Sequence, residues 1–124
     1  MTAPAQVRLR RVYEAPDPSD GQRVLVDRLW PRGLARNKAA IDEWLKTVAP
    51  SDGLRRWYGH QPEKFPAFRQ RYQRELRGAE QSEALDHLRH LARHGTVTLL
   101  TATRDIERSQ AAVLAELLRG TDGH

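Results

Sequence analysis

Residues 23–33 of the chain have the sequence RVLVDRLWPRG, in which an apolar run passes directly into a charged loop. Residues 24–26 are all apolar, which is the pattern of a strand buried on both faces of a parallel sheet. Pro31 and Gly33 then restrict and turn the backbone. We therefore predict a buried strand over residues 23–29 that ends in a loop rich in charge.

Two further segments have strand patterns. Residues 96–102 are rich in β-branched side chains, and residues 7–12 show a weaker alternation. The order strand, strand, several helices, strand, helix predicts an α/β fold. We expect a single three-layer, Rossmann-like domain over residues 6–118, with a small and mainly parallel sheet flanked by helices. Residues 1–5 and 119–124 are expected to be flexible termini.

Helical spacing of apolar residues fills the rest of the chain. Asn37 can cap a helix that stops at Pro50, Ser51 can cap a short turn, Gly95 can end a long helix, and Asp105 can cap the last one. The apolar stripes of these segments are Ile41, Trp44, Leu45 and Val48; Leu54, Trp57 and Tyr58; Phe65, Phe68, Tyr72 and Leu76; Leu85, Leu88, Leu91 and Ala92; and Ile106, Val113, Leu114 and Leu117.

The chain is basic, and nearly all of its positive charge is arginine. Its 124 residues include 21 Lys and Arg against 16 Asp and Glu, a net charge of +5 with histidine neutral. The planar arginine fork suits phosphate and carboxylate, so this balance favours an anionic ligand or nucleic acid. A GC-rich genome, which encodes arginine where others encode lysine, would produce the same excess. Both explanations remain open.

Several classes of protein are excluded by composition. The chain has no cysteine, so it has no disulfide, thiolate nucleophile or thiolate metal site. No apolar run approaches the roughly 20 residues that cross a bilayer. The N-terminal sequence MTAPAQVRLRR lacks the apolar stretch of a secretory signal. We expect a cytoplasmic protein with no membrane association, no cofactor and an undetermined oligomeric state.

The loop after the strand at 23–29 is the first candidate site. Ligands of open parallel sheets bind beyond the carboxyl ends of the strands. Arg28 and Arg32 could hold a phosphate or carboxylate there, with Trp30 packed on the ligand and Asp27 acting as an acid or base. A purely structural alternative is that Asp27 pairs with an arginine and Trp30 closes the edge of the core.

The second candidate loop is residues 101–105, which precede the last predicted helix. The backbone N–H groups at a helix start attract anions, and Thr103 and Arg104 could add donors. If both loops line one cleft, Asp105 and Asp27 could form a general acid/base pair.

Histidine offers a third element of a site. His60 lies in an aromatic loop and could reach a cleft as an acid, base or donor, although fixing the loop to the next helix is the role that the sequence favours. His87, His90 and His94 share one helix, but the helical repeat turns them away from its leucine stripe toward solvent. We therefore predict no metal site.

Two alternatives to a small-anion site remain. A partner protein or a second copy could dock on Trp57 and Tyr58 if these aromatic residues are exposed. A nucleic acid could bind the basic face of the helix that begins near Pro62. That face carries Lys64, Arg71, Arg74 and Arg77.

Residues 24–33, with the sequence VLVDRLWPRG, resemble the hallmark of the YeaO-like branch of the family called domain of unknown function 488 (DUF488). The resemblance extends over about residues 7–118. It implies a three-layer α/β fold with a polar pocket at the strand ends, and it implies no established activity. It continues in Trp44 and Leu45, residues 49–51, Leu54, Trp57, Tyr58, His60, Phe68, Tyr72, and residues 96–100 and 111–117.

The chain departs from this family pattern in the second loop. Relatives often have Tyr-Ala-Ala-Lys-Asp there, followed by a His-Asn pair, whereas this chain has TATRD at 101–105 and then Arg108 and Ser109. Asp105 is retained and Arg104 preserves positive charge. A mechanism that uses the histidine as a base cannot operate here. Either the family's chemistry does not need it, or this protein binds without catalysing.

Overall fold

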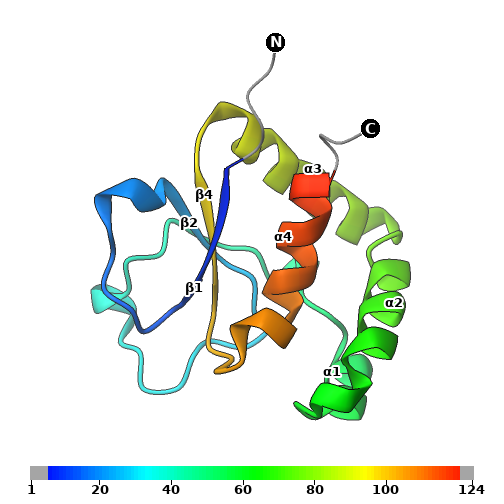
Figure 1. Ribbon diagram of the computed structural model, residues 1–124. Coiled ribbons are helices and arrows are strands. Elements are labelled where there is room, and N and C mark those ends of the chain that lie inside the picture. The colour runs from blue at the N-terminus through cyan, green and yellow to red at the C-terminus, as the bar shows by residue number, and fades with distance from the viewer. Residues whose placement is uncertain (1–5, 121–124) are drawn as a thin grey trace.

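The structure is a computed structural model that describes residues 6–120, and it is an α/β domain built on a small parallel sheet (Figure 1). The four strands found in the described residues are all parallel, in the order β1-β4-β2-β3. This arrangement confirms the predicted fold class. The strands are β1 (Val7–Arg11), β2 (Gln22–Leu25), β3 (Glu43–Trp44) and β4 (Val97–Thr101).

The α-helices all pack on one side of this sheet (Figure 1). Ser51 caps the first of them, since its hydroxyl accepts a hydrogen bond from the Leu54 N–H, and the third ends at Gly95, both as predicted. Of the segments expected to be flexible, residues 1–5 and 121–124 lie outside the described residues, whereas residues 119 and 120 belong to the last helix, which corrects the prediction for these two positions. The helices are α1 (Asp52–Tyr58), α2 (Phe65–Glu75), α3 (Ala79–His94) and α4 (Gln110–Gly120).

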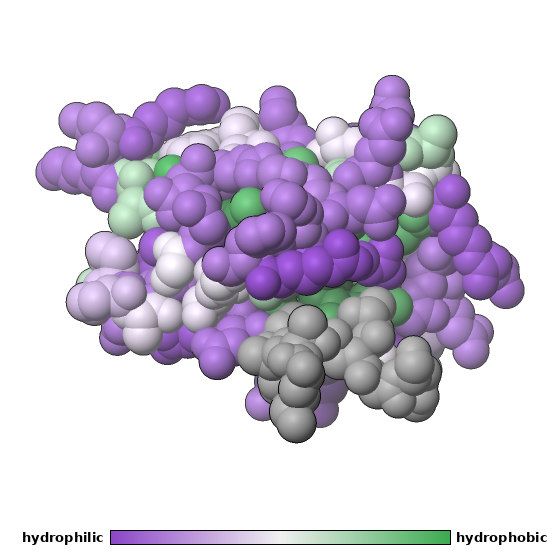
Figure 2. All heavy atoms as spheres, turned by 90° about the horizontal axis from the view of Figure 1, so that it is seen from above, coloured by the Kyte–Doolittle hydropathy of each residue, from purple (hydrophilic) through white to green (hydrophobic). Residues whose placement is uncertain are grey.

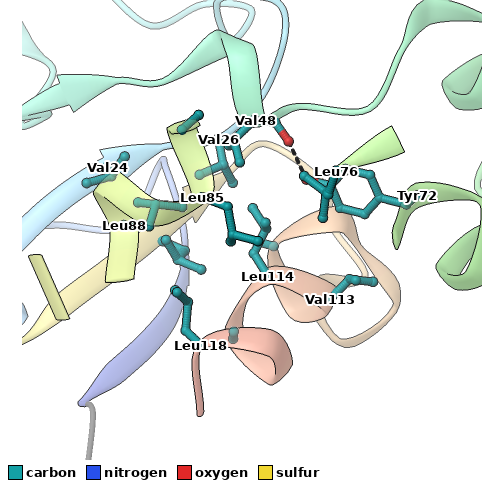
Figure 3. Packing of buried hydrophobic residues seen from close by; sticks show 14 of the residues in the cluster. Val24, Val26, Val48, Tyr72, Leu76, Leu85, Leu88, Val113, Leu114 and Leu118 are labelled. Atoms are coloured by element: carbon teal, nitrogen blue, oxygen red, sulfur yellow. Dashed lines mark hydrogen bonds between the residues drawn. The ribbon is translucent and has the colours of Figure 1, made fainter. Parts of the chain in front are cut away.

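The main core lies between the sheet and these helices (Figure 3). Val24 and Leu99 point from neighbouring strands into it, and Tyr72 of α2 adds a hydroxyl that donates to the Val48 carbonyl. This bond satisfies the polar end of a side chain that is otherwise enclosed by apolar neighbours. The core therefore anchors the loops around α1 and α2 to the sheet.

The other face of the sheet carries a smaller apolar cluster centred on Val12, Leu25 and Leu100. Irregular chain and one 3₁₀ turn between β2 and β3 cover it in place of an α-helix. The third layer of helices that was expected on this face is therefore absent from the described residues (Figure 1). The covering side chains are Trp30, Leu34, Ile41 and Trp44.

The helix predicted from Asn37 to Pro50 is wrong. Two short 3₁₀ turns, Arg36–Lys38 and Lys46–Val48, flank strand β3 there. The apolar residues have helical spacing, but Ile41 and Trp44 pack on one side of the sheet and Leu45 and Val48 on the other. A helix would place all four side chains on one side, and the edge of the sheet needs cover on both.

The prediction that Asp105 caps the last helix is also wrong. Asp105 precedes a 3₁₀ turn, Ile106–Arg108, and makes no capping hydrogen bond. Its carboxylate pairs with the Arg108 guanidinium at 2.9 Å instead. Ser109 has extended backbone angles, which interrupt the helical path, and its hydroxyl accepts from the Ala112 N–H at the start of α4.

The surface at the amino ends of the strands is mostly hydrophilic, with small and separate apolar patches (Figure 2). Over residues 6–120 no helix has the length and apolar content needed to cross a membrane. In the same part of the chain, no group of three or more His, Asp or Glu side chains is arranged to hold a metal ion.

Candidate functional site

A pocket of about 350 Å³ lies at the carboxyl ends of β2 and β4. Its lining includes the loop 27–32 after β2 and residues 102–103 after β4. Residues 108–110 at the start of α4 and two side chains of α1 also line it. The pocket therefore lies where the parallel strands end and continue into loops and helices, as predicted.

Six of the eight predicted site residues line this pocket: Asp27, Arg28, Trp30, Arg32, His60 and Thr103. Arg104 and Asp105 are exposed and do not line it. Because the 3₁₀ turn carries Asp105 out of the cleft, the structure does not bring Asp27 and Asp105 together as an acid/base pair.

Asp27 is held by donors from three different places. Its Oδ1 accepts from the Thr101 hydroxyl at 2.7 Å and from the Gln110 side-chain amide, and its Oδ2 accepts from the Ala102 N–H at 2.8 Å. Burial raises the pKa of Asp27 above its ordinary value, and the hydrogen bonds from Ala102, Thr101 and Gln110 oppose this shift without cancelling it. The structural alternative that Asp27 pairs with an arginine is not what the structure shows, because all three of its hydrogen-bond donors are neutral.

Arg28 ties the first loop to the segment before α1. Its Nε donates to the Pro50 carbonyl at 3.0 Å, and one terminal nitrogen lies 3.4 Å from the Ala49 carbonyl. The guanidinium is thus held beside the pocket with part of its donor capacity unused, since arginine carries five N–H donors. Arg32 is exposed at the pocket, and its side chain makes no hydrogen bond or ion pair within the described residues.

Two further arginines line the pocket, and neither was predicted as a ligand-binding residue. Arg55 of α1 pairs with the exposed Asp52 at 3.2 Å, and Arg108 pairs with Asp105. Arg108 was noted only as the residue in place of a family histidine. Nothing local in the sequence indicated Arg55, because its position depends on where α1 packs.

Trp30 has a structural role at the rim of the pocket. Its indole N–H donates to the Leu34 carbonyl at 2.7 Å, and its ring meets Trp44 edge to face with centroids 5.3 Å apart. The Arg36 guanidinium lies over the ring at 4.7 Å. These contacts fit the alternative in which Trp30 closes the edge of the core.

His60 lines the pocket and has a φ of 57°, in the left-handed region that disfavours residues with a Cβ. Gly59 before it has a φ of 53°. The two residues together turn the chain sharply between α1 and α2, which points the histidine toward the pocket. Strained backbone of this kind is concentrated at binding sites and active sites.

The surfaces on which the alternative functions depend are less available than the sequence suggests. Tyr58 is only 7% exposed, and its hydroxyl donates to the Arg108 carbonyl at 2.6 Å. Lys64 and Arg71 both lie over the Trp57 ring. On α3, His87 is not directed only to solvent, because it contacts Glu43 at 2.8 Å.

Comparison with known proteins places this architecture in a family. Residues 6–121 match the family described as the inactive DUF488-N3 subclade. The chain belongs to the DUF488 family. The uncharacterised protein Rv3073c of Mycobacterium tuberculosis is similar to this DUF488 chain, with 53% identity over 97% of this chain and 99% of that protein.

A second relative, the uncharacterised protein YeaO of Escherichia coli, is 38% identical to this DUF488 chain over 91% of its length and 96% of YeaO. The resemblance to the YeaO-like branch is therefore confirmed. No solved structure is significantly similar to the chain.

Proposed function

We propose that this protein binds a small phosphorylated anion in the pocket and does not turn it over. The observation that carries the proposal is the charge of the lining: four arginines and one histidine against a single carboxylate. Asp27 makes no ion pair with these arginines, since its hydrogen-bond donors are neutral, and its single negative charge offsets only part of their positive charge. The pocket thus keeps a net positive charge that an anion would compensate.

The chemistry of the lining favours phosphate. A guanidinium offers planar, paired donors that match two oxygens of a phosphate or carboxylate. Arg55 and Arg108 have only exposed carboxylates as partners, and exposed ion pairs are weak enough to be exchanged for a ligand.

Binding without turnover is supported by the residue at position 108. Relatives often carry a histidine here, which could move a proton, whereas an arginine cannot be deprotonated in a protein. Arg108 lines the pocket, so the replacement changes the site itself. The matched subclade is described as inactive, which agrees with this proposal.

Thermal denaturation and calorimetric titration with inorganic phosphate, ribose 5-phosphate and adenosine monophosphate would test the proposal. A ligand at 100 times its dissociation constant adds about 2.7 kcal/mol to the free energy of unfolding. The decisive variants are R55A and R56A, which remove the same charge from neighbouring positions of α1. Arg55 lines the pocket, while Arg56 is exposed, does not line it and makes no side-chain hydrogen bond or ion pair within the described residues.

We expect R55A to weaken binding at least tenfold, because a hydrogen bond to a charged group contributes about 1.5–3 kcal/mol, and R56A to leave it unchanged. R32A should also lose affinity without loss of fold. The proposal is wrong if no phosphorylated anion binds, or if the two α1 variants weaken binding equally. Stabilisation by oligonucleotides alone, lost with added salt, would instead indicate a nucleic-acid surface.

A further inference from the structure

A carboxylate is an unexpected component of a pocket for anions. Asp27 is the acidic side chain among the described residues that line the pocket. Its negative charge repels a bound anion, and the repulsion is strong where little water screens it. Such a residue weakens binding unless it interacts favourably with another part of the ligand.

The position of Asp27 is fixed by the fold. Thr101 ends β4, Ala102 follows it, and Gln110 begins α4, so the three donors come from two elements that meet at the carboxylate. Thr101 is fully buried. Three hydrogen bonds of this kind hold both carboxylate oxygens in one orientation.

The carboxylate retains capacity to accept another hydrogen bond. An ionised carboxylate has about four acceptor sites, two on each oxygen. Oδ1 accepts two hydrogen bonds, from Thr101 and Gln110, whereas Oδ2 accepts one, from the Ala102 N–H. Asp27 borders the pocket, so the remaining site on Oδ2 is the one that a ligand donor would use.

We infer that the ligand is a phosphate ester that carries a hydroxyl group, and that Asp27 Oδ2 accepts a hydrogen bond from that hydroxyl. This inference rests on the proposed function. The arginines hold the phosphate, and Asp27 distinguishes hydroxylated esters from anions that have no donor to offer. A buried acceptor rejects a ligand that lacks its partner, because both desolvation and repulsion are then left uncompensated.

The apolar residues of the pocket lining restrict the chemical class of the ligand further. Leu29 is 60% exposed beside the pocket, and Pro31 and Phe68 add apolar surface. A sugar phosphate and the ribose phosphate of a nucleotide share the required hydroxyl and phosphate, and both present apolar faces. The ligand class is therefore a hydroxylated phosphate monoester with an apolar face.

The test compares two phosphate esters of nearly the same size at pH 8, where the phosphate is a dianion and offers no donor of its own. Glycerol 3-phosphate carries hydroxyl groups and n-propyl phosphate carries none. Titration calorimetry measures both with the wild-type protein, with D27N and with D52N as a control. Asp52 is an exposed carboxylate 4.0 Å from Arg28 that does not line the pocket.

We expect the wild-type protein and D52N to prefer glycerol 3-phosphate by about five- to tenfold, the equivalent of one hydrogen bond. In D27N the preference should fall below twofold, and n-propyl phosphate should bind more tightly than to the wild type because the repulsion is gone. Ribose 5-phosphate and adenosine monophosphate, measured alongside, show whether the free sugar phosphate or the nucleotide is held better.

Equal tightening of both esters by D27N would overturn the inference, since Asp27 would then act only as a repulsive charge. A wild-type protein with no preference between the two esters would do the same. Failure of the proposed function has a different signature: neither ester binds, and R55A behaves like R56A.

Discussion

Two partly or fully buried aspartates lie two residues before and two residues after β2, and their surroundings are opposite. Asp20 is 1% exposed and makes ion pairs with three arginines. Asp27 is held by a hydroxyl, a backbone N–H and a side-chain amide. The arginines around Asp20 are Arg8, Arg10 and Arg23.

The pKa values of the two carboxyl groups shift in opposite directions. For Asp20, burial alone would raise the pKa, but the hydrogen bond from the Asp17 N–H and the charge of Arg23 and Arg10 outweigh it, and the pKa is lowered. For Asp27, burial dominates and the pKa is raised. The first aspartate stabilises the fold with its charge. The second makes no ion pair and lies at the pocket, as a binding group would.

The largest effect is expected from Asp20→Asn. Arg23 is 5% exposed, and without Asp20 its charge is left buried with carbonyl partners only. Breaking one partner of a buried ion pair costs about 3–5 kcal/mol. Urea denaturation measures the loss, with D86A as a control, because Asp86 forms an exposed pair with Arg89 and its removal should cost less than about 1 kcal/mol. Similar losses in both variants would contradict the structural role of Asp20.

A smaller effect is expected from Thr101→Val, which removes the hydroxyl that donates to Asp27. A bond to a charged group contributes more than one to a neutral group, so the loss should be about 2 kcal/mol. Thr98→Val is the matched comparison, because the equally buried Thr98 donates to the Asp20 carbonyl, and should cost about 1 kcal/mol. In a D27N background, the cost of Thr101→Val should fall to that of Thr98→Val.

The pH dependence should separate the two aspartates by sign. A lowered pKa stabilises the fold above the pKa of the unfolded chain, and this contribution is lost as the pH falls through the folded value. The difference in the free energy of unfolding between the wild type and D20N should therefore become smaller as the pH is lowered from 7 toward 3. A carboxyl group with a raised pKa, such as that of Asp27, has the reverse effect. Its contribution to the stability of the fold is present in acid and is lost as the pH rises through the pKa of the folded protein.

Asp27→Asn should accordingly be more stable than the wild type at pH 7 and approach it in acid. Thermal denaturation of both variants from pH 3 to pH 8 gives the two trends. If D27N and D20N are both more stable, or both less stable, than the wild type at pH 7, the two aspartates do not affect stability in opposite ways.

The smallest effect is expected from His60→Gly. Glycine adopts the left-handed backbone of this position without strain, so stability should rise by up to about 1 kcal/mol, while His60→Ala, which keeps the Cβ, should not gain. Weaker ligand binding in His60→Gly than in His60→Ala, which both lack the imidazole, would show that the strained backbone serves the pocket. An equal response of both variants would show that the backbone angle is unimportant.

Much of the architecture follows from local sequence patterns. The buried strand β2, the strand β4, the Ser51 cap and the end of α3 at Gly95 depend on residues close together in the chain, and each was predicted, although β2 ends at Leu25 and not at Leu29 as expected. The carboxyl-edge location of the pocket follows from the parallel strands alone. The segment from Arg36 to Val48 was not predictable in this way, because pairing of β3 with β2 is a long-range contact that overrode the helical spacing.

The sequence by itself determined the α/β class and the presence of Asp27, Arg28 and Arg32 at the end of a buried strand, because periodicity and turn residues act over a few positions. Only the tertiary structure decided that Arg55 and Arg108 join them and that Asp105 does not. It also decided that Asp27 meets neutral donors while Asp20 meets arginines. These outcomes depend on how β4, α1 and α4 pack against β2, and packing is set by the whole core at once.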